Sequence, residues 1–251
     1  MKTTDAETSV IDEAVNSAWD KAYAHFRGEG VPANLLNWMC INKSDALTLS
    51  EVIANYRPRR ILEVGTFLGF SAAVMGQLAP TSEIVTIDPN YPLSVISTRF
   101  GYESDRRVLD YAKNCFDALC VSDRITLIEG YFADRSASYL KNYVEQWGGD
   151  PRTAGKDQGE IVESAILAQD PFDMIFIDGD HSETAVYSDL MLAAKMIAPD
   201  GVIVMDDIYL EGDFSIPILA GLRRMLAEVS NNRVRPYEFF ATGGMGILRL
   251  K

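Results

Sequence analysis

The sequence predicts an α/β fold whose mostly parallel, seven-stranded sheet has helices on both faces and an antiparallel C-terminal strand. Continuous apolar runs such as "RILEV" and "MIFI" lack the alternation of a strand with one wet face, which indicates strands buried on both sides. Segments with a helical period separate these runs, as they do where helices connect parallel strands. At 251 residues, 47% of them hydrophobic, the chain is long enough for one large domain of this kind.

The beginning of the chain is predicted to be a helical extension ahead of the sheet. Apolar side chains recur with a helical period over residues 5–26, and a second helical pattern ends where Pro58 stops it. We therefore divide the chain into an N-terminal extension over residues 1–57 and a main domain over residues 58–251.

Strands and helices alternate through the main domain. The predicted strands cover residues 60–65, 83–88, 124–130, 173–178, 201–207, 234–241 and 245–250. The predicted helices cover residues 71–79, 107–119, 182–198 and 216–229, and Ile197 falls on the apolar face of the third. An insertion near residues 145–170 interrupts the alternation. Its glycine-rich part, 148–159, has no apolar period, which predicts a mobile loop that closes over a ligand.

The acidic composition limits the partners that the chain can have. With 23 basic and 36 acidic side chains the net charge is −13, so the phosphates of a nucleic acid would be repelled. No apolar run is long enough to span a bilayer, and the first residues lack the apolar segment of a secretory signal. The three cysteines show no metal-finger spacing and are expected to be reduced. We expect a cytoplasmic homo-oligomer, a dimer, that binds a small molecule and neither nucleic acid nor membrane.

A glycine-bearing turn between the first predicted strand and its helix indicates a nucleoside site. Gly65 and Gly69 lie four apart, where glycine lets the backbone approach a ligand closely. The spacing is G-x-x-x-G and lacks the middle glycine of the dinucleotide fingerprint, which admits a pyrophosphate. Asp88 ends the second strand, 88 − 65 = 23 residues later, where a carboxylate can accept hydrogen bonds from ribose hydroxyls.

With these motifs the sequence resembles the class I S-adenosylmethionine-dependent methyltransferases, and among them the metal-dependent O-methyltransferases. The resemblance covers about residues 58–207 and includes an acidic residue, a glycine turn and a serine at the helix start: Glu63, Gly65, Gly69 and Ser71. It implies a Rossmann-like methyltransferase fold and S-adenosylmethionine as the cofactor. It further implies that Ser71 and the backbone near Phe67 meet the methionine carboxylate, that Asp88 holds the ribose, and that Tyr131 and Phe132 neighbour the adenine.

Acidic residues follow the fourth and fifth strands, at Asp178, Asp206 and Asp207. In the methyltransferase strand order these strands are adjacent, so the three carboxylates would converge at the carboxyl edge of the sheet. Unpaired carboxylates in a cleft repel one another, and a divalent cation removes this repulsion. All-oxygen ligation suits Mg²⁺, Mn²⁺ or Ca²⁺, of which we expect Mg²⁺. The resemblance implies the same three ligands.

Two residues beside the first carboxylate are candidates for the general base. The resemblance to antibiotic-sugar O-methyltransferases implies Asp180 as the base, whereas catechol O-methyltransferases carry a lysine base at the position of His181. We favour Asp180, because the Asp206–Asp207 pair is closer to the sugar enzymes than to the catechol enzymes. The alternatives are that Asp180 serves only the turn with Gly179, and that His181 serves only the start of a helix.

The sequence as a whole predicts a metal-dependent O-methyltransferase that acts on a hydroxyl of a sugar, polyketide-like or phenolic metabolite. The alternatives are a nucleotide-dependent oxidoreductase on a Rossmann sheet and a cofactor-binding protein without transfer activity. The resemblance implies that the N-terminal segment, the loop after the fifth strand and the insertion form the walls of the substrate pocket. Four side chains in these segments could form an apolar wall: Trp38, Met39, Tyr209 and Phe214.

Overall fold

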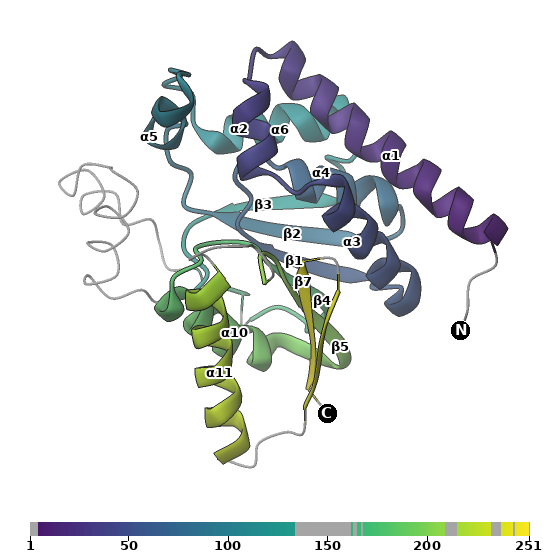
Figure 1. Cartoon of the computed structure of the whole chain (residues 1–251), viewed down its shortest axis with the longest axis vertical. Helices are drawn as coiled ribbons and strands as arrows, with labels where there is room; N and C mark the ends of the chain where they lie inside the picture. Colours follow the sequence, from purple (N-terminus) through teal and green to yellow (C-terminus); the bar gives the residue numbers. More distant parts are fainter. Residues whose placement is uncertain are drawn as a thin grey trace.

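The computed structural model describes residues 5–133, 162, 165–166, 168–208, 215–231, 237–242 and 244–250. Its seven-stranded sheet has the order β3-β2-β1-β4-β5-β7-β6. The strands are β1 (Arg60–Val64), β2 (Glu83–Asp88), β3 (Ile125–Glu129), β4 (Phe172–Ile177), β5 (Ile197–Met205), β6 (Tyr237–Thr242) and β7 (Met245–Leu250). The first five pair in parallel, and β7 runs antiparallel to both β5 and β6, so the predicted fold class is confirmed (Figure 1).

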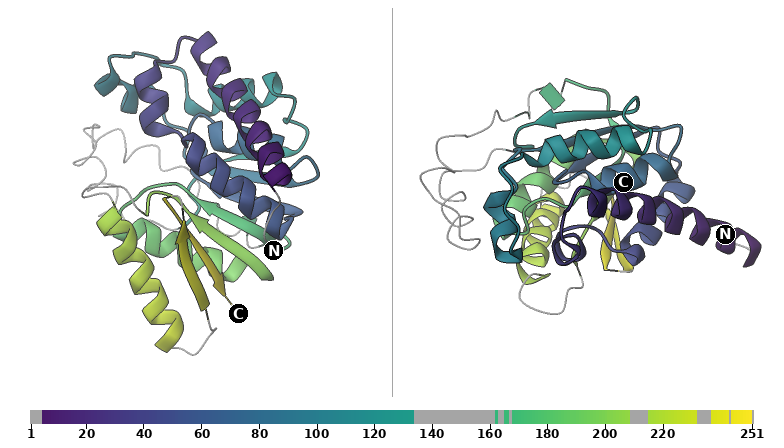
Figure 2. Two further views of the ribbon diagram at one scale, coloured as in Figure 1. Left: turned by 45° about the vertical axis from the view of Figure 1, so that its right-hand side comes forward. Right: turned by 90° about the horizontal axis from the view of Figure 1, so that it is seen from above.

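Helices cover both faces of the sheet (Figures 1 and 2). One face carries α1 (Asp5–Gly28), α3 (Lys43–Tyr56), α4 (Phe70–Leu78) and α6 (Val108–Ala118), which contact one another, and the other face carries α10 (Glu183–Met196) and α11 (Ser215–Asn231). Three shorter elements are α2 (Ala33–Met39), α5 (Ser94–Ser97) and the 3-10 helix η1 (Thr98–Phe100).

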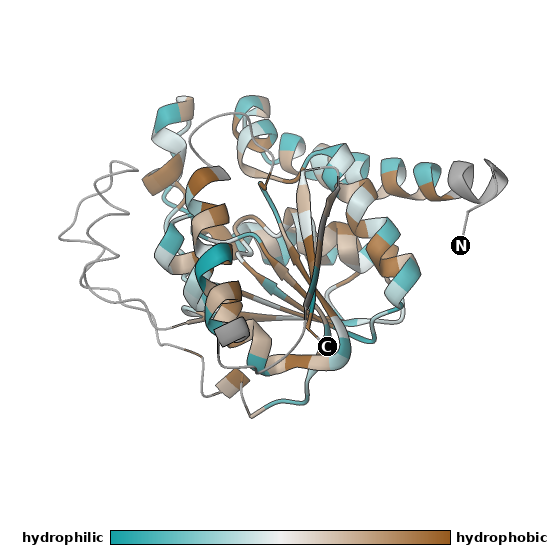
Figure 3. Ribbon diagram, turned by 60° about the horizontal axis from the view of Figure 1, so that its bottom comes forward, coloured by the Kyte–Doolittle hydropathy of each residue, from teal (hydrophilic) through white to brown (hydrophobic). Residues whose placement is uncertain are grey.

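Side chains of each strand alternate between two apolar cores. Along β4, Met174 and Phe176 join the core under α4, while Ile175 and Ile177 join the core under α10. This period of two, with apolar residues on both faces, is what the continuous apolar runs of the sequence require. The strands accordingly show hydrophobic colouring along most of their length between the helical layers (Figure 3).

The N-terminal helices pack onto the same core. Trp19 meets the edge of Phe70 at a ring-centroid distance of 5.5 Å, and Phe26 stacks on Phe70 at 5.9 Å. Apolar residues of α1, α2 and α3 thereby belong to one cluster with those of α4. This packing fixes the α2–α3 segment relative to the carboxyl edge of the sheet.

A capping box starts helix α3 next to that edge. The Asn42 side chain accepts hydrogen bonds from the Ser44 and Asp45 amides at 2.7 and 3.1 Å, and the Asp45 carboxylate accepts one from the Asn42 amide at 2.8 Å. These contacts satisfy amides that the first helical turn leaves without partners, and they fix the Asp45 side chain.

One predicted boundary was wrong. The expected helix 182–198 ends at Met196, and Ile197 begins β5 instead of belonging to the apolar face of the helix. The strand starts early because it contains an irregularity: Phe172 pairs with Ile197, whereas Met174 pairs with Val202. An added Cβ on Gly201 would lie 2.7 Å from the Ile197 side chain and 2.9 Å from the Asp173 carbonyl oxygen. The backbone there is too close to its neighbours for any residue except glycine.

The predicted loop 148–159 lies outside the described residues, as does most of the insertion near 145–170. Within the ranges that the structure covers, no helix is long and apolar enough to cross a membrane.

Candidate active site

A cavity of about 480 Å³ lies at the carboxyl edge of the sheet. Its walls come from the turns after β1, β2, β3, β4 and β5 and from the α2–α3 segment of the N-terminal extension. This is the edge at which parallel α/β sheets bind their ligands.

The glycine turn after β1 lies against the end of β4, and residues of both segments line the cavity. Gly65 has a φ of +100°, and a Cβ there would lie 2.1 Å from the carbonyl oxygen of Asp178. Gly69 has a φ of +78°, and a Cβ there would lie 2.8 Å from side-chain atoms of Ala112 and Phe116. Both positions therefore require glycine for conformation and for space. The turn consequently touches the end of β4, where the acidic residues begin.

Asp88 is held in a fixed orientation at the end of β2. One of its carboxylate oxygens accepts a hydrogen bond from the Phe67 amide at 2.8 Å, and the other accepts one from the Asn90 amide at 2.7 Å. Phe67 has a left-handed backbone with φ of +47°, which turns its amide toward Asp88. Asp88 lines the cavity, where a carboxylate can accept hydrogen bonds from the hydroxyls of a ligand.

The other predicted cofactor residues lie on or beneath the same cavity. Ser71 lies in the first turn of α4, and Tyr131 and Phe132 follow β3; all three are buried and line the cavity. The Tyr131 hydroxyl is hydrogen-bonded to that of Tyr91. The predicted set thus comes together around one cavity, except that Glu63 and Gly69 are not among the residues that line it.

Glu63 is completely buried, and the Thr86 hydroxyl donates a hydrogen bond to its carboxylate. Burial raises the pKa of Glu63 to about 8, and hydrogen bonds from Ser71 and Thr86 oppose this rise only in part. In the ligand-free protein at neutral pH, Glu63 is therefore mostly protonated, as expected for a carboxyl group with no cation next to it.

Replacing Glu63 by glutamine should flatten the pH dependence of stability. Folding raises the pKa of Glu63 from 4.5 to about 8, so the folded state keeps a proton that the unfolded state releases. The stabilising contribution of this proton is complete below pH 4.5 and is lost as the pH rises through about 8, by roughly 1.4 kcal/mol per pH unit. Urea unfolding of ligand-free wild type and Glu63→Gln across this range measures the difference. Parallel stability curves would show that Glu63 is already ionised in the folded protein.

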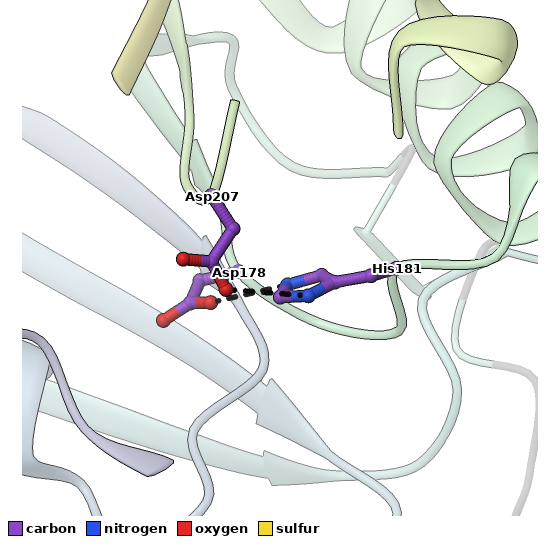
Figure 4. Close-up of side chains that lie close together, drawn as sticks. All are labelled: Asp178, His181 and Asp207. Carbon is purple, nitrogen blue, oxygen red and sulfur yellow. Dashed lines mark ion pairs between the residues drawn. The ribbon is translucent and has the colours of Figure 1, made fainter. Parts of the chain in front are cut away.

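Three ionisable side chains converge beyond the glycine turn, where β4 and β5 end. His181 lies between two carboxylates: its Nδ1 is 3.3 Å from Asp207 Oδ2, and its Nε2 is 3.5 Å from Asp178 Oδ1 (Figure 4). One ligand atom from each of Asp178, His181 and Asp207 lies within 4.8 Å of the other two. Asp207 adopts a left-handed backbone with φ of +58°, which breaks the line of β5 at this point.

The carboxylates of this cluster are in an unfavourable environment for negative charge. Burial raises the pKa of Asp178, although the neighbouring His181 opposes this rise. Burial and then Asp178, Asp45 and Asp207 raise the pKa of Asp206 well above its ordinary value. Burial also raises the pKa of Asp207 to about 6, with His181 opposing. Oxygen donors that repel one another in a buried cleft fit a hard divalent cation, which would relieve the repulsion.

His181 supplies the positive charge in the structure as it stands. Burial lowers the pKa of its imidazole, but the carboxylates of Asp178, Asp207 and Asp180 more than offset this effect, and the pKa is raised overall. The sequence did not predict this place for His181 between the carboxylates, because spacing along the chain does not give the direction of the ring.

The structure separates two predicted residues from the three-membered cluster. Asp206 is buried and lines the cavity, but it is not among the three residues with mutually close ligand atoms. Asp180 lines the cavity and accepts a hydrogen bond from the Ser182 amide at 2.7 Å, which makes it part of the turn that leads into α10.

The α2–α3 segment adds a carboxylate that sequence reasoning missed. Asp45 lines the cavity, and its charge raises the pKa of Asp206. The sequence contains only its capping-box signal, which describes a helix start and gives no position relative to the sheet. Of the four residues expected to form an apolar wall, Trp38 and Met39 line the cavity, and Tyr209 and Phe214 lie outside the described residues.

The fold is Rossmann-like, and its cavity joins the residues predicted to bind a nucleoside with an acidic cluster. Comparison with known proteins gives the family. Residues 62–208 match the family model described as a methyltransferase domain, which is more than half of the chain. The chain therefore belongs to this methyltransferase family, and the expected class I S-adenosylmethionine-dependent methyltransferase is confirmed.

Curated relatives match over shorter regions. The O-methyltransferase hkm8 of Aspergillus hancockii is 26% identical over 153 residues, which are 60% of this chain and 43% of that protein. The uncharacterized protein R132 of Acanthamoeba polyphaga mimivirus is 32% identical over 71 residues, 28% of this chain and 32% of its own length. The chain thus spans less than half the length of each of these relatives.

Solved structures share the fold over nearly the whole chain. The O-methyltransferase from Bacillus cereus in complex with S-adenosylhomocysteine has a TM-score of 0.58 at 17% identity, covering 96% of this chain and 97% of that chain. TomG from Streptomyces achromogenes, an O-methyltransferase of tomaymycin synthesis solved with S-adenosylmethionine, has a TM-score of 0.56 at 17% identity, covering 93% and 89%. Podospora anserina PaMTH1, bound to S-adenosylhomocysteine, has a TM-score of 0.56 at 16% identity, covering 100% and 98%.

Proposed function

We propose that the protein is a divalent-metal-dependent O-methyltransferase that transfers the methyl group of S-adenosylmethionine to a hydroxyl of a small-molecule metabolite. The observation that supports this proposal is the contact between the glycine turn, which we propose binds the cofactor, and the end of β4, where the acidic cluster begins. The curated relative hkm8 and two of the solved neighbours named above, from Bacillus cereus and Streptomyces achromogenes, are described as O-methyltransferases, and PaMTH1 is described as a methyltransferase.

The residues of the nucleoside pocket have distinct roles in this proposal. Asp88 holds the ribose, Ser71 and the backbone near Phe67 orient the methionine end, and Tyr131 and Phe132 flank the adenine. Glu63 supports the turn from below. The N-terminal extension, residues 1–57, contributes the acceptor side of the site through its α2–α3 segment.

The acidic residues would hold the cation through Asp178 and Asp207, with Asp206 beside them. The cation, when bound, supplies a Lewis acid that makes an acceptor hydroxyl more acidic. The acceptor oxygen attacks the methyl carbon, the bond from carbon to the sulfonium sulfur breaks, and S-adenosylhomocysteine leaves. Our candidate for the base that takes the hydroxyl proton is His181, which lines the cavity and faces Asp178 and Asp207. A cation held by these carboxylates would offset their charge, favour the neutral imidazole and so leave a ring nitrogen able to accept the proton. We prefer His181 to Asp180, because Asp180 serves the turn into α10.

An oxidoreductase on the same sheet is less well supported. The turn has the spacing Gly65-x-x-x-Gly69, and the Gly65 position is filled by the backbone of Asp178, so the close approach of a pyrophosphate has no counterpart here.

A labelled-methyl assay tests the proposal. With S-adenosylmethionine, Mg²⁺ and a panel of hydroxyl acceptors, at least one acceptor should gain the label, and excess chelator should reduce the rate by ~10²-fold or more. Re-adding Mg²⁺ should restore the rate, and calorimetry should show that the chelator leaves cofactor binding intact. Full activity in excess chelator would mean that the carboxylates are not a catalytic metal site.

A further inference from the structure

Asp45 brings a carboxylate to the acceptor side of the cavity from an element outside the sheet. It belongs to the first turn of α3, and its side chain is 8% exposed. Its Oδ1 lies against the turn between β6 and β7, because a Cβ added to Gly244 would be 3.7 Å away. A hydrogen bond connects that turn to the segment after β5 that contains Asp206 and Asp207: the Ile208 amide donates to the Gly244 carbonyl at 2.9 Å.

Among the described residues, only one of the two Asp45 oxygens has a hydrogen-bond partner. Oδ2 accepts the hydrogen bond from the Asn42 amide that completes the capping box. Oδ1 receives no hydrogen bond from the residues that the structure describes. The cap needs a single acceptor atom, so helix capping accounts for Oδ2 and leaves Oδ1 unexplained. A largely buried side chain that lines a cavity, and that has one carboxylate oxygen without a hydrogen bond from the described residues, is suited to meet a donor on a ligand.

The charges around the cavity indicate which donor it would be. Among the described residues that line it, six are aspartates and no lysine or arginine is present: Asp45, Asp88, Asp178, Asp180, Asp206 and Asp207. His181 is the one basic side chain of this described lining. A divalent cation (+2) and S-adenosylmethionine, whose sulfonium and ammonium are offset by one carboxylate (net +1), together bring a net charge of +3, less than the six carboxylates. Asp45 is not one of the three residues whose ligand atoms lie within 4.8 Å of one another, so its carboxylate remains for another positively charged group.

We propose that Asp45 is a specificity-determining residue whose Oδ1 binds a protonated amine of the acceptor, which makes amine-bearing hydroxyl compounds the substrate class. This inference rests on the proposed O-methyltransferase function and adds the chemical class of the acceptor to it. Compounds with a carboxylate or phosphate near the reacting hydroxyl are disfavoured by the same charges.

Matched acceptor pairs test the assignment by binding, without requiring transfer. The pairs are a catechol with an aminoethyl or a hydroxyethyl chain, and a hexose with an amino group or a hydroxyl at one carbon. Calorimetry with S-adenosylhomocysteine and Mg²⁺ present gives the affinity of each. On at least one scaffold the amine should bind wild type roughly 10- to 100-fold more tightly than its hydroxyl analogue, as a charge-assisted hydrogen bond would provide.

Asp45→Asn should remove this preference, by lowering the affinity for the amine ~10-fold or more and that for the hydroxyl analogue less than ~3-fold. The amide oxygen of the new side chain can still accept the Asn42 amide, so α3 keeps its cap. Glu51→Gln, an exposed change on the same helix with the same loss of charge, is the control and should keep the preference.

Two results would overturn the inference: no preference for the amine in wild type on either scaffold, or an unchanged preference in Asp45→Asn. Failure of the proposed function looks different. In that case the amine preference depends on Asp45, but labelled cofactor transfers no methyl group to either member of a pair.

Discussion

Asp178→Asn is expected to lower the rate of methyl transfer by ~10³-fold or more, since a bound cation contributes several kcal/mol and each 1.4 kcal/mol is tenfold in rate. Asp178 is central to the cluster, because its charge raises the pKa of Asp206 and it lies 3.5 Å from His181. Binding of Mg²⁺, measured by calorimetry, should weaken in parallel with the rate. The affinity for S-adenosylhomocysteine should change by less than ~3-fold, since Asp88 and the glycine turn remain.

The matched control is Asp173→Asn, the same substitution near the start of β4, whereas Asp178 directly follows the end of that strand. Asp173 accepts hydrogen bonds from the amides of Arg59 and Arg60 at 2.8 and 3.0 Å, which an amide oxygen can also accept. It should keep both turnover and Mg²⁺ affinity. If Asp178→Asn turned over like this control, the acidic cluster would have no part in the reaction.

His181→Ala should reduce turnover at saturating Mg²⁺ by ~10²- to 10⁴-fold, the usual contribution of a general base. In contrast to Asp178→Asn, this variant should bind Mg²⁺ at least as well as wild type. The imidazole is the positive charge next to Asp178 and Asp207, so its removal leaves both carboxylates free to hold a cation. Rapid-quench measurement of a single turnover gives the rate of methyl transfer, and a separate titration gives the affinity for Mg²⁺. Together they distinguish loss of the base from loss of the cation.

Asp180→Asn is the comparison for the assignment of the base. Its amide oxygen can keep the hydrogen bond from the Ser182 amide, so the turn into α10 should survive. We expect this variant to retain most of its activity. If it lost the activity and His181→Ala did not, Asp180 would be the base, as the likeness to the antibiotic-sugar enzymes suggested.

The sequence predicted the sheet well because its strands carry a strong local signal. The run "EIVTID" is apolar on both faces, and β2 spans those residues. At the start of β5 the local signal was misleading, because the helical pattern continues through Ile197 and only the pairing with Phe172 makes that residue a strand residue. Tertiary context decided the boundary there.

The site could be predicted where it follows from strand order and not where it depends on side-chain direction. Asp88, Asp178 and Asp207 were expected at the carboxyl edge because each follows a strand. The place of His181 between carboxylates and the approach of Asp45 depend on ring orientation and on how the N-terminal helices pack. Neither leaves a periodic signal in the sequence.

The contact between Gly65 and Asp178 limits how such an enzyme can change its substrates. Besides the close approach at Gly65, the Asp178 amide donates a hydrogen bond to the Val64 carbonyl at 2.9 Å, so backbone is fixed to backbone where the two strands end. Mutations cannot shift the cofactor turn and the acidic strand end independently. New acceptors should therefore be sought by varying the α2–α3 segment, which reaches the cavity from another layer. A library confined to residues 37–42 would leave the glycine turn and the acidic cluster unchanged and would alter which acceptors bind in the cavity.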